Sequence, residues 1–459
     1  MTHQLSTTRR PPGPRGSYLT GNLKAYEQDR LEFLLGIRDE YGGVAAFDTR
    51  TTVISDLDVV DRILRDPTGT FEVDQNVLGQ HLDADQVASI LALRAHLNPT
   101  LRPATLTRTA LNVASLTSER LENVSTESFD PLLMGECVVA EAFSWHLFGP
   151  GQRPFLEQVK ELLDSLEPRI GDVMTLPASW RSPRQRRVER RHHALRRELV
   201  DYLRRLPDRQ LPASHQLEAG IAGRLAESTN GGHSTEQVAD LLIGAMLAAQ
   251  RVPAAGISWA LIEVADHPEL QPALRQEAAR FRDHACSGLG TSAVQFPLAL
   301  AAVTEALRLH PPTWLTTRTV LRATRVSGYE FERGHVFMIS PYVLHRDPRL
   351  FTNPTDFNPH RWQDRTTTPQ SFLAFGRGRH RCPGSDFATT ALVAMLLTLQ
   401  RNSSLARRGV YGVEVKNTLR PTGLKIVRTP AADTHDVFTS DIDSRPSTTE
   451  TKPWRTVRT

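Results

Sequence analysis

The segment Phe375–Gly384, FGRGRHRCPG, decides how the rest of this 459-residue chain is interpreted. Its glycines allow positive φ and a close approach of the backbone to a flat ligand. Cys382 stands just before Ser385–Gln400, an apolar stretch that we expect to be a long helix. The positive end of that helix dipole favours a thiolate, and neighbouring backbone N–H groups can tune its donation to a metal. The segment therefore predicts a metal-bound cysteinate.

Two other interpretations of this loop were weighed. An inert, buried cysteine in a Gly-rich turn is the first. A zinc site is the second, but Cys137 and Cys286 lie far away in the sequence and form no CxxC pair. Three cysteines without an even framework are typical of a reducing cytoplasm.

Composition favours a large globular protein. Of the residues, 39% are hydrophobic and 23% are charged, which is enough apolar material for a substantial core. The N-terminus has no apolar core of signal-peptide type, and we expect no membrane span and a cytoplasmic location. The formal net charge of +4 does not require a nucleic-acid partner.

The stretch Arg181–Arg205 is strongly basic. Val188, Leu195 and Leu199 recur in it at helical spacing, so a solvated helix face is the favoured interpretation. A nucleic-acid or membrane-surface patch is the alternative. Few aromatic residues interleave with the arginines, which argues against stacking on bases. Strongly salt-dependent retention of DNA would distinguish the two.

Periodicity predicts a mainly helical body with short strands. We expect one domain at residues 11–428, a flexible start at 1–10 and a disordered tail at 429–459. Helical patterns cover Asn22–Tyr41, Glu236–Asp266, which is interrupted by Pro253, and Ser385–Gln400; a hairpin is expected at Val44–Ser55, strands near Thr317–Val326 and Val336–Ser340, and irregular chain at Asp347–Phe375.

FGRGRHRCPG resembles the cysteine-ligand loop of cytochromes P450, with Phe seven residues before the Cys and Gly two after it. The resemblance spans about residues 11–428. It implies a mainly α fold, a helical haem domain with small β-sheets, in which Cys382 is the axial ligand of haem b. It also places Phe375, Gly376 and Gly384 around the cofactor.

Two further segments carry the same resemblance. In TEALRLHPP, Glu305 and Arg308 lie one helical turn apart and can pair. FNPHRW supplies Arg361. In the family the corresponding three residues form a buried network behind the cysteine loop, so these three are expected to be structural. The segment Tyr342–Phe351, YVLHRDPRLF, also resembles the family.

Haem carries two propionates, which need cationic partners. By position in the family pattern, His380, Arg318 and Arg94 are the candidates. Arg94 lies in a segment that resembles the family's Trp-x-x-x-Arg helix, but Ile90 occupies the Trp position. An ordinary surface position is the alternative for each of the three.

The long helix departs from the family. Aligned on Trp259 and His267-Pro268-Glu269, it reads AAQRVP at residues 248–253, with Arg251 in place of the family's acid and Val252 in place of its threonine. That pair delivers protons during oxygen activation, and valine has no hydroxyl group to do so. Ala248, Ala249, Arg251 and Val252 are predicted to line the distal side of the haem.

Several explanations of this departure stay open. A substrate hydroxyl or carboxylate can replace the missing groups. The oxidant can be hydrogen peroxide, with a substrate acid held by Arg251, as in fatty-acid peroxygenases, whose Arg and Pro are adjacent. The product can arise by radical coupling or desaturation. Finally, Arg251 can turn toward solvent without consequence.

The resemblance implies a monooxygenase-type oxidoreductase acting on a small organic molecule. A specialised metabolite is the expected substrate, and secondary metabolism is the expected setting. Trp314, Leu315 and Thr316 are expected either to line the substrate pocket or to pack in the core. With no flavin or iron–sulfur module apparent, a ferredoxin and its reductase are the expected electron donors. Arg377, Arg379 and Arg381 would face an acidic ferredoxin. A haem-binding sensor or scaffold is the non-enzyme alternative.

Overall fold

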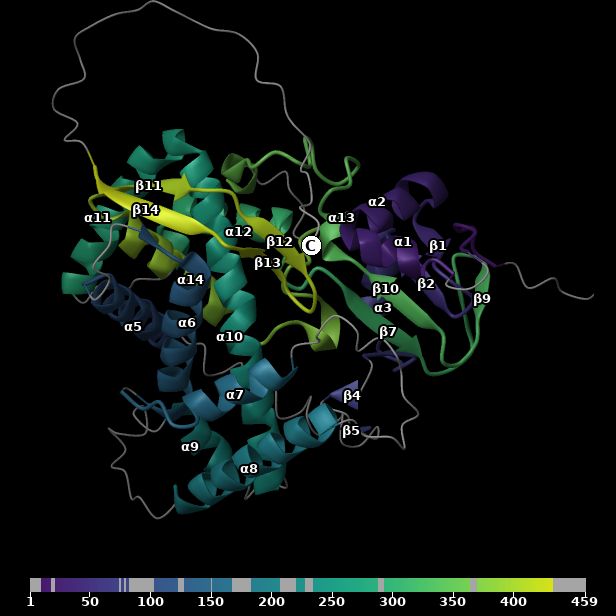
Figure 1. Cartoon of the computed structure of the whole chain (residues 1–459), viewed down its shortest axis with the longest axis horizontal. Helices are drawn as coiled ribbons and strands as arrows, with labels where there is room; N and C mark the ends of the chain where they lie inside the picture. Colours follow the sequence, from purple (N-terminus) through teal and green to yellow (C-terminus); the bar gives the residue numbers. More distant parts are fainter. Residues whose placement is uncertain are drawn as a thin grey trace, which may run out of the picture.

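The computed structural model describes residues 10–17, 21–73, 76–77, 80–81, 103–122, 128–149, 151–166, 183–206, 220–227, 234–287, 293–363 and 370–431. A mainly helical body lies on one side and a small mixed sheet with short helices on the other (Figure 1). The predicted mainly α class with small sheets is confirmed. The helices are α1 (Leu23–Gln28), α2 (Arg30–Tyr41), α3 (Leu57–Leu64), α5 (Pro103–Glu122), α6 (Pro131–Phe148), α7 (Leu156–Leu166), α8 (Pro183–Arg205), α9 (Gly220–Glu227), α10 (Thr235–Asp266), α11 (Gln271–Ser287), α12 (Pro297–Leu309), α13 (Pro341–Leu344) and α14 (Ser385–Gln400).

The largest sheet has the strand order β1-β2-β10-β7-β3. Its members are β1 (Val44–Ala46), β2 (Thr51–Ile54), β3 (Phe71–Glu72), β7 (Thr316–Val320) and β10 (Val336–Ile339). The other strands are β4 (Asn76–Val77), β5 (Gln80–His81), β6 (Ser128–Phe129), β8 (Thr324–Val326), β9 (Tyr329–Phe331), β11 (Ser403–Arg408), β12 (Gly412–Val415), β13 (Leu419–Thr422) and β14 (Lys425–Pro430).

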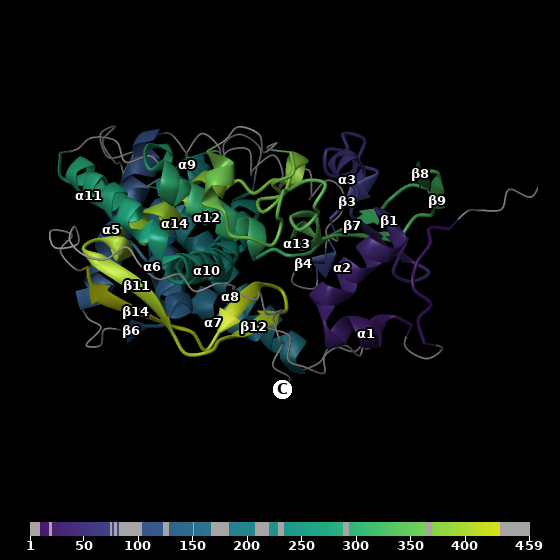
Figure 2. The same cartoon turned by 90° about the horizontal axis from the view of Figure 1, so that it is seen from above.

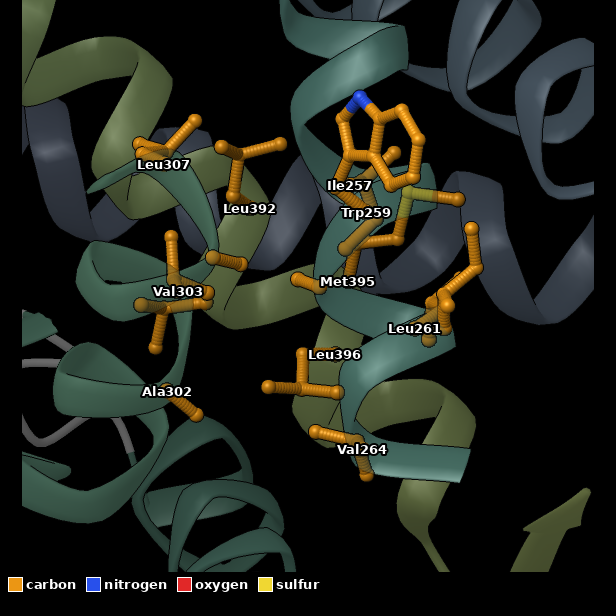
Figure 3. Packing of buried hydrophobic residues seen from close by; sticks show 14 of the residues in the cluster. Ile257, Trp259, Leu261, Val264, Ala302, Val303, Leu307, Leu392, Met395 and Leu396 are labelled. Atoms are coloured by element: carbon orange, nitrogen blue, oxygen red, sulfur yellow. The ribbon is translucent and has the colours of Figure 1, made fainter. Parts of the chain in front are cut away.

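The core is organised around α10, which crosses the helical body (Figures 1 and 2). Ser234 and Gln237 form a capping box at its start, which satisfies N–H groups that the first turn leaves open. Side chains of its second half, from Ile257 to Val264, pack against α12 and α14 (Figure 3). α14, which follows the cysteine loop, is therefore held against the longest described helix.

α10 carries an 18-residue window with a mean hydropathy of 1.4, long and apolar enough to cross a bilayer. However, 61% of this window is buried within the protein. A helix that is apolar all round and covered by other helices is typical of a protein core.

Most predicted elements are confirmed, with three differences. The helix predicted at Asn22–Tyr41 is divided at Asp29, whose extended backbone leaves the helix while its carboxylate caps α2. α10 continues through Pro253 without a break. The four strands after Arg401 were not predicted, and β14 extends to Pro430, beyond the expected boundary at 428.

The basic helix α8 is amphipathic as predicted. Its apolar residues Val188, Leu195 and Leu199 are buried in a cluster with α9 and α10. Arg196 makes a bidentate ion pair with Asp240 of α10, with N–O distances of 2.6 and 3.0 Å. Part of the positive charge of α8 is therefore paired with α10 and is not available to an external partner.

Candidate functional site

Backbone hydrogen bonds close the cysteine loop. The amide of Cys382 donates to the carbonyl of Phe375 at 2.8 Å. Gly376 and Gly378 have φ of 67° and 68°, a region that other residues rarely adopt. A Cβ on Gly378 would also collide with the carbonyl of Leu64 at the end of α3. These features hold the half-buried Cys382 just before the N-terminus of α14, as the sequence predicts.

Small residues form an open stripe along α10. Gly244 and Ala248 are exposed, and Ala249 and Val252 are partly exposed, on a helix that is otherwise largely buried. A Cβ at Gly244 would meet nothing within 4 Å. One turn after Val252, the space beside Gly256 is filled by side chains of α12 and α14. The stripe can therefore receive a flat group or a substrate.

Two basic groups near β7 suit the carboxylates of a ligand. Arg318 is 4% exposed, and its Nη1 donates to Thr316 Oγ1 at 3.1 Å and to the Thr317 carbonyl at 2.8 Å. Burial lowers the pKa of Arg318 to about 10. Within the described part of the chain, no carboxylate forms an ion pair with it. His380 Nε2 is buried and lies 2.6 Å from Glu72 Oε1.

Glu72 is a site residue that sequence reasoning missed. It is 5% exposed, and it also accepts a hydrogen bond from Arg379 Nη2 at 2.6 Å. Burial acts to raise the pKa of Glu72, but His380, the Val73 amide and Arg379 outweigh it, so the pKa is lowered. The contact with His380 is an ion pair when the imidazole is protonated. An acid in a short strand carries no sequence signal for such a role.

The structure brings Glu305, Arg308 and Arg361 together. Arg308 and Arg361 reach the Glu305 carboxylate with N–O distances of 2.8 Å, and both Glu305 and Arg308 are fully buried. Trp362 Nε1 and the Asn358 amide complete its shell, at 2.8 and 3.0 Å. Burial acts to raise the pKa of Glu305, but the hydrogen bond and charge of Arg308 lead the groups that lower it.

His345 connects this network to the cysteine loop. Its Nδ1 lies 2.8 Å from the Arg308 carbonyl, and its Nε2 lies 2.9 Å from the Leu373 amide. Because that amide can only donate, Nε2 accepts and Nδ1 carries the proton. Burial lowers the pKa of His345 to about 3, so the ring is neutral. The Leu373 carbonyl in turn accepts from Gly376 at 2.9 Å.

Arg251 finds partners within the protein. Its Nη2 lies 2.5 Å from Asp164 Oδ1 on α7, and its Nε lies 3.9 Å from Glu136 Oε1 on α6. Its side chain is 16% exposed, so it is neither turned freely toward solvent nor left as an unpaired cation. An anionic substrate at Arg251 would have to displace these carboxylates.

The three residues expected either to line the substrate pocket or to pack in the core have different surroundings. Trp314 is 3% exposed, and its Nε1 donates to the Lys416 carbonyl at 2.7 Å, which is what the packing interpretation predicts. Leu315 packs against the main core, and Thr316 supports Arg318. Arg94 and Ile90 lie outside the described residues.

The three arginines expected to face a ferredoxin differ in their partners. Arg377 pairs with Asp61 at 3.1 Å, and Arg379 pairs with Glu72. Arg381 is exposed and lies 3.4 Å from Ser385 Oγ. Of these side chains, Arg381 therefore presents its charge outward most directly.

The comparisons agree with this geometry. The sequence profile described as cytochrome P450 matches residues 11–419, and the chain belongs to the cytochrome P450 family. This confirms the resemblance and identifies a family of haem-thiolate oxidoreductases.

Relatives match parts of the chain. A cyclooctatin synthase from Streptomyces melanosporofaciens is 35% identical over 37% of this chain and 38% of its own length. A lanosterol 14-alpha demethylase from Eremothecium gossypii is 31% identical over 36% of each chain. The putative cytochrome P450 139 of Mycobacterium tuberculosis (strain ATCC 25618 / H37Rv) is 30% identical over 54% of this chain and 58% of its own length. The matched regions thus span 36–58% of these relatives.

The described residues fit a haem. Cys382 lies just before the N-terminus of α14, where a sulfur can serve as a thiolate ligand. The buried guanidinium of Arg318 suits a propionate carboxylate, and the imidazole of His380 supplies a second basic group in the cysteine loop. The small residues of α10 leave room beside it.

Proposed function

We propose that this chain is a monooxygenase-type cytochrome P450 that oxidises a small organic substrate with a haem b ligated by Cys382. The observation that carries the proposal is the closed Phe375–Gly384 loop at the start of α14, in a chain whose family is shown. When bound, a haem with a cysteinate ligand supplies electron donation that favours cleavage of the O–O bond.

The proposed site divides into a thiolate ligand, basic groups for the haem carboxylates and small residues on the distal side. The helix dipole of α14 keeps Cys382 as a thiolate. Arg318 and His380 bind the haem carboxylates, and Arg94 is proposed as a third partner. Ala248, Ala249 and Val252 leave space for substrate on the distal side. Because Val252 cannot donate a proton, a substrate group or water must do so.

The relatives favour a largely apolar substrate. The names of two relatives point to a sterol and to cyclooctatin, and the open stripe of α10 consists of apolar side chains. We extend this substrate class to the chain as part of the proposal, together with a specialised metabolic role, a cytoplasmic location and a ferredoxin with its reductase as electron donors.

A peroxide-using enzyme that anchors a fatty acid on Arg251 is the weaker candidate. The guanidinium already has Asp164 and Glu136 as partners. Support for a sensor or scaffold rests on the missing acid–threonine pair alone.

The haem assignment is tested on the purified protein. The reduced, carbon-monoxide-bound form should show the red-shifted Soret band of a thiolate-ligated haem, and Cys382→Ala should lose it. The same band in Cys382→Ala would refute the ligand. Titrating the ferric protein with sterols, terpenoids and fatty acids, and following displacement of water at the Soret band, then identifies the substrate class. Turnover with electrons separates an enzyme from a sensor.

A further inference from the structure

A buried carboxylate, Glu72, lies beside His380, which is assigned to the haem edge, and beside Arg379, its neighbour in the cysteine loop. Arg379 Nη2 donates to its Oε2 at 2.6 Å, and His380 Nε2 lies 2.6 Å from its Oε1. The Val73 amide donates to Oε1 at 2.9 Å. Glu72 therefore contacts two consecutive side chains of the cysteine loop from a strand 307 residues earlier.

The fold fixes the position of Glu72. β3 pairs with β7 so that Glu72 is opposite Thr319, next to Arg318. Upstream, the Asp66 carboxylate accepts hydrogen bonds from the Phe71 amide and its neighbours, which sets the turn that leads into the strand. Phe71 also packs against Phe337, with ring centroids 5.7 Å apart. Strand pairing and the packing of Phe71 thus fix the backbone at Glu72, and with it the point from which the carboxylate extends.

The contacts of Glu72 restrain side chains that would otherwise have several rotamers. The Arg379 side chain is 35% exposed, and without Glu72 it would be held by its 3.3 Å hydrogen bond to the Phe71 carbonyl and could more easily turn into solvent. Carboxylates behind histidine and arginine donors orient those donors toward a bound group. Arg318 differs, because its Nη1 is already held by Thr316 and Thr317. The orientation of the Arg318 side chain is therefore set by β7 itself and not by Glu72.

We infer that Glu72 is a positioning residue that holds Arg379 and His380 for the haem carboxylates, and that its negative charge lowers the reduction potential of the bound haem. The inference rests on the haem binding proposed above. A competing role, in which Glu72 occupies the place of a haem carboxylate, predicts the opposite effect on haem affinity.

The test uses the holoprotein with Glu72→Gln, which keeps the shape of the side chain and removes its charge. Haem transfer to an excess of apomyoglobin should become roughly tenfold to a hundredfold faster, as for other residues that orient a ligand. The reduction potential, measured by spectroelectrochemistry, should become more positive. Asp61→Asn is the matched control, because it removes the 3.1 Å ion pair of Arg377 in the same loop. Its haem loss and potential should stay close to those of the unmodified protein.

Unchanged or slower haem loss in Glu72→Gln would overturn the inference, as would an equal change in Asp61→Asn. If Glu72→Gln fails to fold, Arg379→Gln provides a second route and should also accelerate haem loss; no effect there overturns the proposal. If the variants fold, the double variant Glu72→Gln/Arg379→Gln should accelerate haem loss by less than the combined effects of the two single substitutions, because both remove the same contact. Loss of the red-shifted carbon-monoxide band in the unmodified protein would instead reject haem-thiolate binding.

Discussion

Glu305 is the residue on which the buried interactions behind the cysteine loop converge. It is fully buried between two arginines, and one of them, Arg308, is fully buried as well. Removing the carboxylate leaves a buried cation with backbone carbonyls as partners but without a counter-charge, which is more costly than losing an exposed ion pair. The network is therefore expected to act on stability and not on chemistry.

Glu305→Ala should lower the free energy of unfolding by ~3 kcal/mol or more and should reduce haem retention. Glu141→Ala is the matched control, because Glu141 is also buried but its partners, Arg120 and Arg153, are 39% and 62% exposed and can turn to water. We expect ~1 kcal/mol there. Urea unfolding with haem absorbance compares the two, and equal losses would contradict the buried network.

His345 gives the protein a pH dependence of known sign. Its pKa is about 3 in the folded protein, against an ordinary value of 6.5. Between these values the unfolded chain binds the proton more readily, so the contribution of His345 is complete above pH 6.5 and is lost as the pH falls toward 3. One such group gives a slope of up to about 1.4 kcal/mol per pH unit.

His345→Asn should flatten the fall in stability between pH 6.5 and 5, where most carboxylates remain ionised. The slope should not vanish, because burial also lowers the pKa of His310. Urea midpoints measured at several pH values check this. An unchanged slope in the variant would mean that His345 does not titrate on unfolding as the structure implies.

At the scale of elements, α10 is the helix that departs most from the family. Its partly exposed Val252 lies one turn after the exposed Ala248. Val252→Thr should reduce the fraction of electrons released as hydrogen peroxide when a ferredoxin reduces the protein without a hydroxyl-bearing substrate, because threonine adds a donor. Val252→Ala is the control, since it changes volume without adding a hydroxyl. If both variants behave like the unmodified protein, the proton path does not pass this position.

The Arg251–Asp164 ion pair joins α10 to α7. Because the guanidinium is already paired, Arg251→Ala should affect an acid and its neutral analogue equally in spectral binding titrations. An anion-binding Arg251 would instead weaken the acid alone, by roughly tenfold to a hundredfold. Asp164→Ala gives the second half of the test: it should resemble Arg251→Ala, whereas an anion site would bind acids more tightly after it.

At the scale of the whole molecule, electron delivery depends on the proposed acidic ferredoxin. Arg377 and Arg379 pair with Asp61 and Glu72, and both Arg379 and Arg381 are exposed. Arg381→Glu should slow reduction by the ferredoxin and flatten its dependence on ionic strength, because exposed charges act mainly on association. Arg197→Glu on the exposed face of α8 makes the same change in net charge and should have little effect. Equal slowing would show that only overall charge matters.

The sequence alone determined the family, the thiolate loop and the main helices. These features are local: FGRGRHRCPG and TEALRLHPP are contiguous, and helical or alternating periodicity is visible within ten to thirty residues. For the same reason the hairpin at Val44–Ser55 and the helix Ser385–Gln400 could be predicted. The ion pair of Glu305 and Arg308 needed only one helical turn.

Only the tertiary structure decided the partners of the remaining charges. Arg251 pairs with Asp164, 87 positions earlier, and Glu72 pairs with Arg379, 307 positions later. Trp314 donates to the Lys416 carbonyl, 102 positions later. A charged or aromatic side chain shows in sequence what it can bind, but its choice of partner depends on which distant elements packing brings within about 4 Å, where ion pairs and hydrogen bonds form.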